Sequence, residues 1–256
     1  MSEKLTRRKL ESLQRESLHN ARNWSKADVS LAEFPVGSKR RVVIKDLRQR
    51  PLWFRVLAGR ALLRREWRAL CALKNVDGVP LPVARPDADC IVMEWCAGTP
   101  IENLPDGEVP DGTVARLGVL LDEMHRRGVT HGDLHGFNIL VDENGNVSLI
   151  DWATACVFGA KAKLLKISGA KKWTWEEWKA LDERAFAKIK LTHEPAGITA
   201  RQRDLIIHGG SRVYRAIKKF KSLRETLRGP NEARRKAREA KQNQYLNRLD
   251  EYYRAD

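Results

Sequence analysis

The sequence predicts an α+β fold of two lobes, and three features of the chain lead to this prediction. Strand-like segments dominate the first 98 residues, and helical patterns dominate the remainder. A stretch rich in Pro, Gly and Asp, at residues 104–112, is expected to form a hinge between the two parts. The 256 residues, of which 42% are hydrophobic, suffice for one two-lobed domain.

Periodicity assigns the elements of the N-terminal half. Leucines in near-helical register predict a polar helix over residues 4–23, and a strongly periodic pattern predicts a second helix over 57–73. Strand-like runs occupy residues 28–34 and 41–46, with a turn-rich connection between them. A short apolar run predicts a further strand over 91–95.

The C-terminal half begins with Thr113, a good N-cap for a periodic helix that Gly128 ends. Residues 139–141 and 147–150 flank an Asn-Gly turn and predict a β-hairpin. From Trp175 onward the pattern is helical to the end of the chain.

Composition and charge limit the possible binding partners and the cellular compartment of the protein. The formal net charge of +15 predicts an acidic partner: a nucleotide, a nucleic acid, an anionic membrane surface or a phosphorylated glycan. Four cysteines without CxxC spacing favour reduced, mostly buried thiols over a zinc site or disulfides. We find neither the apolar stretch of a signal peptide nor a run near the ~20 residues of a membrane span. We therefore expect a cytoplasmic protein whose basic surface can rest on the inner face of the cytoplasmic membrane.

The most informative block is His-Gly-Asp-Leu-His-Gly-Phe-Asn-Ile-Leu at residues 131–140, followed by the hairpin and Ile150-Asp151-Trp152. Phosphoryl transfer from a nucleotide needs oxygen ligands for a divalent metal and a carboxylate that orients the acceptor hydroxyl. Asp133 suits the proton of the acceptor. Asn138 and Asp151 are hard oxygen ligands that suit Mg²⁺.

This block resembles the catalytic loop and the metal-binding strand of the protein-kinase-like superfamily. With Gly132 where protein kinases have Arg, it is similar to the atypical branches: aminoglycoside and choline kinases, RIO-type kinases, and bacterial lipopolysaccharide-core (Kdo/heptose) kinases. The resemblance implies a two-lobed kinase fold with ATP and Mg²⁺ as cofactors. It covers roughly residues 42–152.

The N-terminal half adds to the resemblance. Residues 42–45, Val-Val-Ile-Lys, match the kinase strand whose lysine binds the α- and β-phosphates, which implies this role for Lys45. Glu66 lies on the apolar face of the 57–73 helix and needs a cationic partner there. Lys45 is the natural partner, and three neighbouring arginines are the alternative: Arg64, Arg65 and Arg68.

Residues 91–95 resemble the strand and hinge that receive adenine in kinases. The resemblance implies Met93 as the gatekeeper, and the backbone groups of Glu94 and Cys96 as adenine ligands.

Two features depart from the kinase pattern. No GxGxxG loop occurs between Trp24 and Lys45, where only Gly37 is found, so the phosphates must be covered differently or left uncovered. Asp151-Trp152-Ala153 replaces DFG, and no A-P-E segment follows. The missing A-P-E favours the branches that act on small molecules and glycans over peptide-directed protein kinases.

The same residues allow other interpretations. His125, His131 and His135 suggest a metal cluster, but we favour a role for His131 in holding the loop backbone by hydrogen bonds. Asp133 also opens a D-x-H-G tetrapeptide like that of metallophosphoesterases, whose GD and GNH motifs do not follow.

Two basic segments each allow two interpretations. Trp173, Trp175 and Trp178 beside two lysines suggest a patch for sugar or nucleic acid, and helix packing explains them equally well. The run at 234–238 suits phosphates of RNA or lipid, as it does a solvated basic helix.

Taken together, these features predict three parts. Residues 1–98 are an N-terminal helix plus a β-rich nucleotide-binding lobe, residues 99–230 a helical catalytic lobe, and residues 231–256 a basic helix or tail. We expect transfer of the γ-phosphate of ATP to a hydroxyl, with a lipopolysaccharide-core sugar or related glycan as the acceptor. A RIO-like serine/threonine protein kinase and a nucleotide-binding pseudokinase scaffold are the alternatives. Binding to nucleic acid rests on charge alone.

Overall fold

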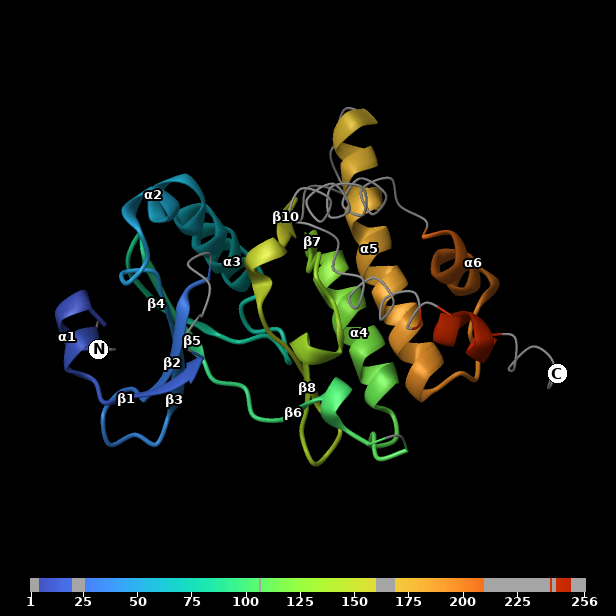
Figure 1. The fold of residues 1–256 in the computed structure, drawn as a ribbon, viewed down its shortest axis with the longest axis horizontal. Coiled ribbons are helices and arrows are strands. Elements are labelled where there is room, and N and C mark those ends of the chain that lie inside the picture. Colours follow the sequence, from blue (N-terminus) through green and yellow to red (C-terminus); the bar gives the residue numbers. More distant parts are fainter. Residues whose placement is uncertain are drawn as a thin grey trace.

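A β-rich N-terminal lobe and a helical C-terminal lobe make up the structure, a computed structural model (Figure 1). It describes residues 5–19, 26–105, 107–159, 169–209, 240 and 243–249. The α+β class with two lobes, predicted from the sequence, is confirmed. Within these ranges no helix is both long and apolar enough to cross a lipid bilayer.

One antiparallel sheet with the strand order β1-β2-β3-β5-β4 forms the N-terminal lobe. The strands predicted near residues 28–34, 41–46 and 91–95 are all present. The five strands are β1 (Arg15–His19), β2 (Asp28–Glu33), β3 (Arg41–Asp46), β4 (Pro82–Asp87) and β5 (Cys90–Glu94). Strand β4 was not predicted because it contains two prolines, which the edge of a sheet tolerates.

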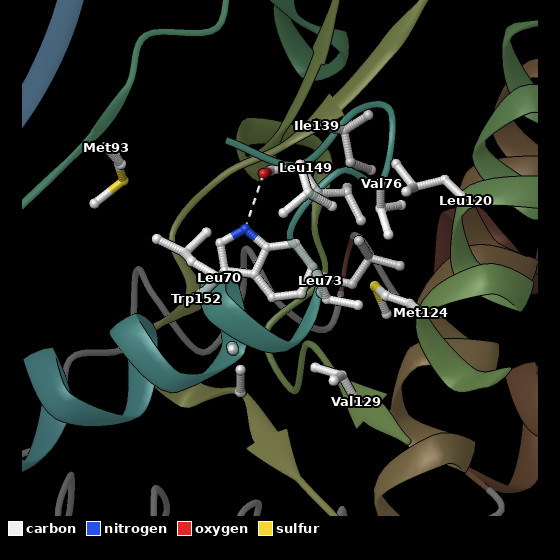
Figure 2. Packing of buried hydrophobic residues seen from close by; sticks show 14 of the residues in the cluster. Leu70, Leu73, Val76, Met93, Leu120, Met124, Val129, Ile139, Leu149 and Trp152 are labelled. Atoms are coloured by element: carbon white, nitrogen blue, oxygen red, sulfur yellow. Dashed lines mark hydrogen bonds between the residues drawn. The ribbon is translucent and has the colours of Figure 1, made fainter. Parts of the chain in front are cut away.

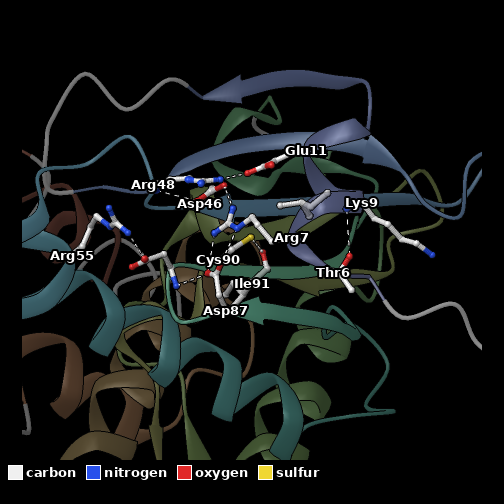
Figure 3. Close-up of polar contacts among 12 residues, drawn as sticks. Thr6, Arg7, Lys9, Glu11, Asp46, Arg48, Arg55, Asp87, Cys90 and Ile91 are labelled. Carbon is white, nitrogen blue, oxygen red and sulfur yellow. Dashed lines mark hydrogen bonds and ion pairs between the residues drawn. The ribbon is translucent and has the colours of Figure 1, made fainter.

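The helix predicted over residues 4–23 is wrong for most of its length. Only α1 (Arg7–Ser12) is helical, and β1 follows it and pairs with β2. The Arg7 guanidinium binds the carboxylates of Asp46 and Asp87 and ties α1 to the sheet, at 2.6 Å from Asp87 (Figure 3). An open sheet edge therefore outweighs the weak helical periodicity of these residues. Residues 20–23 lie outside the described part.

The predicted helix 57–73 is confirmed, and it begins earlier than expected. A short helix α2 (Leu52–Phe54) and a π-helical turn η1 (Arg55–Gly59) lead into α3 (Arg60–Ala72). A Cβ at Gly59 would lie 2.8 Å from Leu47 Cδ1, so a larger residue in this turn would have to displace the Leu47 side chain. The buried face of α3 carries Leu63, Glu66, Ala69 and Leu70.

The C-terminal lobe contains the helices α4 (Thr113–Arg126), α5 (Gly169–His193) and α6 (Ala200–His208). Thr113 is the first residue of α4 and not its N-cap, which corrects the prediction. Gly112 occupies the cap position with φ +75°, and the Thr113 hydroxyl donates instead to Pro110 O at 2.6 Å. The predicted hairpin is confirmed as β8 (Ile139–Val141) and β9 (Val147–Leu149).

The lobes are joined at residues 95–98, and not in the 104–112 stretch predicted as a hinge. The chain leaves β5 and enters β6 (Thr99–Pro100), which already pairs with β8 of the C-terminal lobe. Gly98 adopts φ +135° there, and a Cβ would lie 2.8 Å from Val141 O. The connection is therefore short, and the 104–112 stretch belongs to the C-terminal lobe.

A single hydrophobic cluster spans both lobes (Figure 2). Trp152 is fully buried at its centre, and its indole N–H donates to Leu149 O at 3.0 Å. The side chains labelled around it come from the α3 region, β5, α4, β7 (Val129–Thr130) and the hairpin: Leu70, Leu73, Val76, Met93, Leu120, Met124, Val129 and Ile139. This cluster fixes α3 relative to the hairpin that carries Asp151.

The helical pattern predicted from Trp175 onward is present in α5, in α6 and at residues 243–249. Leu249 is buried in a small cluster with Leu191 and Ile206, so residues 243–249 pack on α5 and α6. The basic run at 234–238 lies outside the described part.

Candidate active site

Lys45 and Glu66 form an ion pair in the cleft between the lobes. Lys45 Nζ lies 2.7 Å from Glu66 Oε1, and the Glu66 side chain is only 1% exposed. Glu66 Oε1 also accepts from the backbone N–H of Trp152 at 3.3 Å. The predicted pairing is confirmed, and the alternative pairing of Glu66 with arginines of its own helix is wrong, because those arginines point outward and are exposed.

Lys45 also reaches the C-terminal lobe, where its Nζ lies 3.0 Å from Asp151 Oδ1. Burial works against the ammonium, but the carboxylates of Glu66 and Asp151 outweigh it and raise the pKa of Lys45 above its ordinary value. Burial likewise favours the neutral form of Asp151, yet the Lys45 charge keeps the pKa of this carboxyl below its ordinary value. Both groups are therefore charged at neutral pH.

Asp151 has a left-handed backbone, with φ +64° and ψ 70°. This conformation is uncommon outside glycine and is concentrated at functional sites. It lies between β9 and the 3₁₀ turn η4 (Trp152–Thr154), and it leaves the Asp151 side chain 51% exposed toward the cleft. The buried Trp152 anchors the following turn and holds Asp151 in place.

His131 organises the loop of residues 131–138. Its Nε2 donates to Ile150 O at 3.0 Å, and its Nδ1 accepts from the Asp133 backbone N–H at 3.4 Å. These roles fix the neutral tautomer, in agreement with burial, which lowers the pKa of His131. The predicted backbone-holding role is confirmed. In the described ranges no group of His, Cys, Asp and Glu has the arrangement of a metal cluster.

Asp182 of α5 holds the same loop and was missed by sequence reasoning. Its carboxylate is fully buried and accepts from the backbone N–H groups of His131 at 2.8 Å and Gly132 at 2.9 Å, and from His125 Nε2 at 3.1 Å. A single Asp within a long helix carries no motif that would have identified it. Its function depends entirely on the packing of α5 against the loop.

Gly132 stands where protein kinases have Arg, and the structure explains why glycine is needed. Its φ is +78°, and a Cβ would lie 2.8 Å from the Trp178 ring. Trp178 and the buried Trp175 therefore pack against the lobe, which favours the packing interpretation of these tryptophans. The side chain of Trp173 lies outside the described part.

Asp133 and Asn138 lie at the two ends of the loop. The Asp133 side chain is 52% exposed, and its Oδ2 lies 3.8 Å from His135 Nε2. Asn138 is buried, and its Nδ2 donates to Asp133 O at 2.9 Å, so Oδ1 is its available oxygen. The amide oxygen of Asn138 and the carboxylate of Asp151 are the donor types that Mg²⁺ prefers, so the residues present fit this ion.

The residues that the resemblance implied as the hinge lie at the end of β5 and directly after it, and their role toward adenine stays a prediction. Met93 is buried at the end of β5. The backbone N–H groups of Glu94 and Trp95 donate to Leu81 O and Arg41 O, whereas that of Cys96 makes no hydrogen bond within the described part of the chain. A cavity of about 380 Å³ borders Glu94 and Cys96, but its other walls are residues 75–79, Leu81 and Ser148. None of the charged residues of the cleft lines this cavity, so we do not assign adenine to it.

The two-lobed fold, the Lys45–Glu66 pair and the loop carrying Asp133 and Asn138 define a domain of the protein-kinase-like class. Comparison with known families leads to a narrower assignment. The RIO domain model matches residues 38–162, just under half of the chain. This segment is therefore similar to the RIO domain, in agreement with its protein-kinase-like fold.

Individual relatives match over shorter segments. The chain is 37% identical over 93 residues to the "Probable bifunctional tRNA threonylcarbamoyladenosine biosynthesis protein" of Methanothermobacter thermautotrophicus, which covers 35% of this chain and 16% of that protein. It is 32% identical over 74 residues to "Serine/threonine-protein kinase rio2" of Schizosaccharomyces pombe, covering 29% and 21%. It is 33% identical over 84 residues to "Serine/threonine-protein kinase RUNKEL" of Arabidopsis thaliana, covering 30% and 6%. The chain thus spans about a fifth or less of the length of these relatives.

Proposed function

We propose that this protein is an ATP- and Mg²⁺-dependent phosphotransferase that moves the γ-phosphate to a hydroxyl group. The carrying observation is the continuous chain of charges from Glu66 through Lys45 to Asp151, which links the two lobes beside the exposed carboxylate of Asp133. A scaffold has no physical need for such a chain, because burial of Glu66 and Lys45 adds a desolvation penalty without a ligand to bind.

Each residue then has one task. Lys45, oriented by Glu66, would bind the α- and β-phosphates, while Asn138 Oδ1 and Asp151 would hold Mg²⁺. The ion, when bound, neutralises charge on the phosphates. Asp133 would align the acceptor hydroxyl and take its proton, since its carboxylate is exposed and not engaged in a close ion pair. The backbone of Cys96, together with that of Glu94, would bind adenine below Met93.

For the acceptor we propose a serine or threonine hydroxyl of a protein. The support is that two of the relatives with matching segments are named serine/threonine-protein kinases. The lipopolysaccharide-core sugar expected from the sequence has no support among the relatives named above. A glycan stays a second candidate for one reason: Phe137, beside Asn138, exposes 53% of its surface, and an exposed ring suits stacking on a sugar.

The test is transfer of radiolabelled γ-phosphate from ATP, with Mg²⁺, to a protein panel, to purified lipopolysaccharide core and to the enzyme itself. Asp133→Asn is run in parallel, because it keeps the size of the side chain and removes the base. Label in one acceptor that disappears in this variant supports the proposal and identifies the acceptor class. Equal label in both proteins, or none in any acceptor, contradicts it and favours the pseudokinase alternative.

We also propose that the protein contacts anionic membranes through the segment that precedes α3. Four apolar side chains there are exposed by more than half although all are large: Leu52, Trp53, Val56 and Leu57. Arg48, 57% exposed and paired with Glu11, lies next to this segment in sequence, and the whole chain carries a net charge of +15. Apolar side chains beside cationic ones suit the interface of an anionic bilayer.

A further inference from the structure

A basic cluster lies on the exposed face of α3, away from the face that carries Glu66. Arg64, Arg65 and Arg68 form one wall of a cavity of about 410 Å³, and residues 155–158 form the opposite wall. Among the described residues, no acidic side chain lines this cavity. Its volume is many times the roughly 30 Å³ that one water occupies, so it can hold a polyatomic ion.

The three guanidinium groups have no acidic partner within the described part of the chain. No ion pair joins any of them to a carboxylate, and all three side chains are exposed. Glu66, the nearest carboxylate in sequence, is turned to the opposite face and occupied by Lys45. Like charges one turn apart destabilise a helix, so this cluster is unfavourable unless an anion binds to it.

We propose that this cavity, formed by Arg64, Arg65, Arg68 and residues 155–158, binds a phosphoryl group. Arginine presents planar pairs of N–H donors that match phosphate oxygens, and three of them can neutralise a dianion. The anion would bridge α3 to the segment that follows Asp151, because residues 155–158 include β10 (Cys156–Val157) immediately after the η4 turn.

Such a bridge would regulate the cleft. Glu66 lies between Arg65 and Arg68 in the sequence of α3, so an anion that fixes α3 also fixes the partner of Lys45. This regulatory role rests on the proposed phosphotransferase function, whereas binding of the anion does not. The two can therefore be tested separately.

Cys156 in the cavity wall provides a local reporter that does not require activity. Alkylation of its thiol by iodoacetamide is followed by peptide mass spectrometry with and without inorganic phosphate, at constant ionic strength. The exposed Cys71, at the far end of α3, is the internal reference. Bound phosphate covers Cys156 and opposes formation of its thiolate, so we expect alkylation of Cys156 to slow at least about threefold and that of Cys71 to stay unchanged.

The arginines are tested by the triple change Arg64→Gln, Arg65→Gln and Arg68→Gln, which should abolish the effect of phosphate on Cys156. A control removes the same number of charges elsewhere, by Arg8→Gln, Arg48→Gln and Arg126→Gln, and should keep the effect. The comparison is made within each variant, because burial raises the thiol pKa of Cys156 and Arg65 partly opposes this rise. Single changes, each expected to weaken the protection, replace the triple variant if it does not fold.

Protection that is equal in the triple variant, or absent up to about 20 mM phosphate, overturns the proposal. If protection occurs, O-phosphoserine acting at lower concentration than inorganic phosphate assigns the site to a phosphorylated side chain, and the reverse order assigns it to a soluble phosphate. Phosphate should then change the rate of γ-phosphate transfer in the wild type and not in the triple variant. A lack of transfer in every protein would contradict the proposed function and leave the alkylation result intact.

Discussion

At the scale of single residues, the cleft combines backbone strain with charge. Asp151 holds a left-handed conformation, and its carboxylate faces the Lys45 ammonium at 3.0 Å. Residues in such conformations are destabilised by about 1–3 kcal/mol unless the surroundings hold them. Here the buried Trp152 and the ion pair with Lys45 hold the residue, which favours a functional reason for the strain.

Asp151→Ala and Asp151→Gly separate these two contributions. Both remove the proposed metal ligand, so phosphotransfer should fall by orders of magnitude in each. Glycine adopts positive φ without strain, so the Gly variant should be more stable than the Ala variant by about 1 kcal/mol in urea unfolding. Equal stability of the two variants would show that the backbone of Asp151 is not strained.

His131 makes the stability of the domain depend on pH. Its pKa in the folded protein lies below its ordinary value of 6.5, so the unfolded chain binds the proton more readily. Stability is therefore complete above about pH 6.5 and is lost as the pH falls from there toward the lowered pKa. Burial lowers the pKa of His131 by more than the nearby carboxylates of Asp182, Asp151 and Asp133 raise it.

We expect the urea midpoint of the wild type to fall between pH 7.5 and pH 5.5 more than that of His131→Phe. His208→Phe is the control, because His208 is exposed at the end of α6 and its change should leave the wild-type slope intact. An unchanged slope in His131→Phe would assign the pH dependence to other groups.

At the scale of elements, α5 supports the catalytic loop through one carboxylate. Asp182 accepts hydrogen bonds from two backbone N–H groups of the loop and from one imidazole N–H. Because the carboxylate is fully buried, water cannot replace these hydrogen bonds. A buried donor that loses its acceptor costs about 1–3 kcal/mol. The position of His131 and Gly132 therefore depends on a helix some fifty residues further along the chain.

Asp182→Ala should lower the free energy of unfolding by about 2–4 kcal/mol and reduce kcat more than it changes KM for ATP. The adjacent Glu183→Ala is a matched control: Glu183 pairs with Lys179 and Arg201 near the surface, so its loss should have little effect. Denaturant unfolding and steady-state kinetics measure both. Similar losses in the two variants would contradict the role given to Asp182.

The segment α2–η1 carries the proposed membrane contact. Leu52→Ser together with Leu57→Ser should reduce co-sedimentation with phosphatidylserine-containing vesicles severalfold, because two large apolar side chains no longer enter the interface. Val119→Ser, at an equally exposed apolar position of α4, should leave it unchanged. Binding that persists in the double variant, or falls equally in the control, would remove this segment from the proposal.

At the scale of the whole molecule, the two lobes are connected covalently by residues 95–98 and electrostatically by the Lys45–Asp151 pair. The shared cluster around Trp152 adds apolar contact between α3 and the C-terminal lobe (Figure 2). A ligand that binds between the lobes should therefore stabilise the whole domain. The proposed division into residues 1–98, 99–230 and 231–256 places Lys45 and Glu66 in the first part and Asp151 in the second.

We predict that ATP raises the melting temperature only when Mg²⁺ is present. At a concentration of one hundred times its Kd, a ligand stabilises the folded state by about 2.7 kcal/mol, and EDTA should abolish most of this effect. Asp151→Asn should lose the metal-dependent part, while Asp204→Asn, at an exposed position on α6, should keep it. An equal shift with and without Mg²⁺ would favour a nucleotide-binding scaffold.

The sequence by itself determined the α+β class, the principal strands and helices, and the ordered set Lys45, Glu66, Asp133, Asn138 and Asp151. These follow from local chemistry, since periodicity, turn residues and short motif spacings act within a few residues of the chain. The spacing of the loop and hairpin was specific enough to predict a kinase-type domain, and the RIO domain match agrees with it.

Only the tertiary structure decided which partners these residues have. Residues 15–19 form a strand because the edge of β2 was free to pair, and Asp182 reaches the catalytic loop because α5 packs beside it. Glu66 pairs with Lys45, and not with the arginines of its own helix, because it lies on the buried face of α3. Those arginines, Arg64, Arg65 and Arg68, line a separate cavity. Such pairings join residues far apart in the chain, and no local pattern encodes them, because their energy comes from burial that exists only after folding.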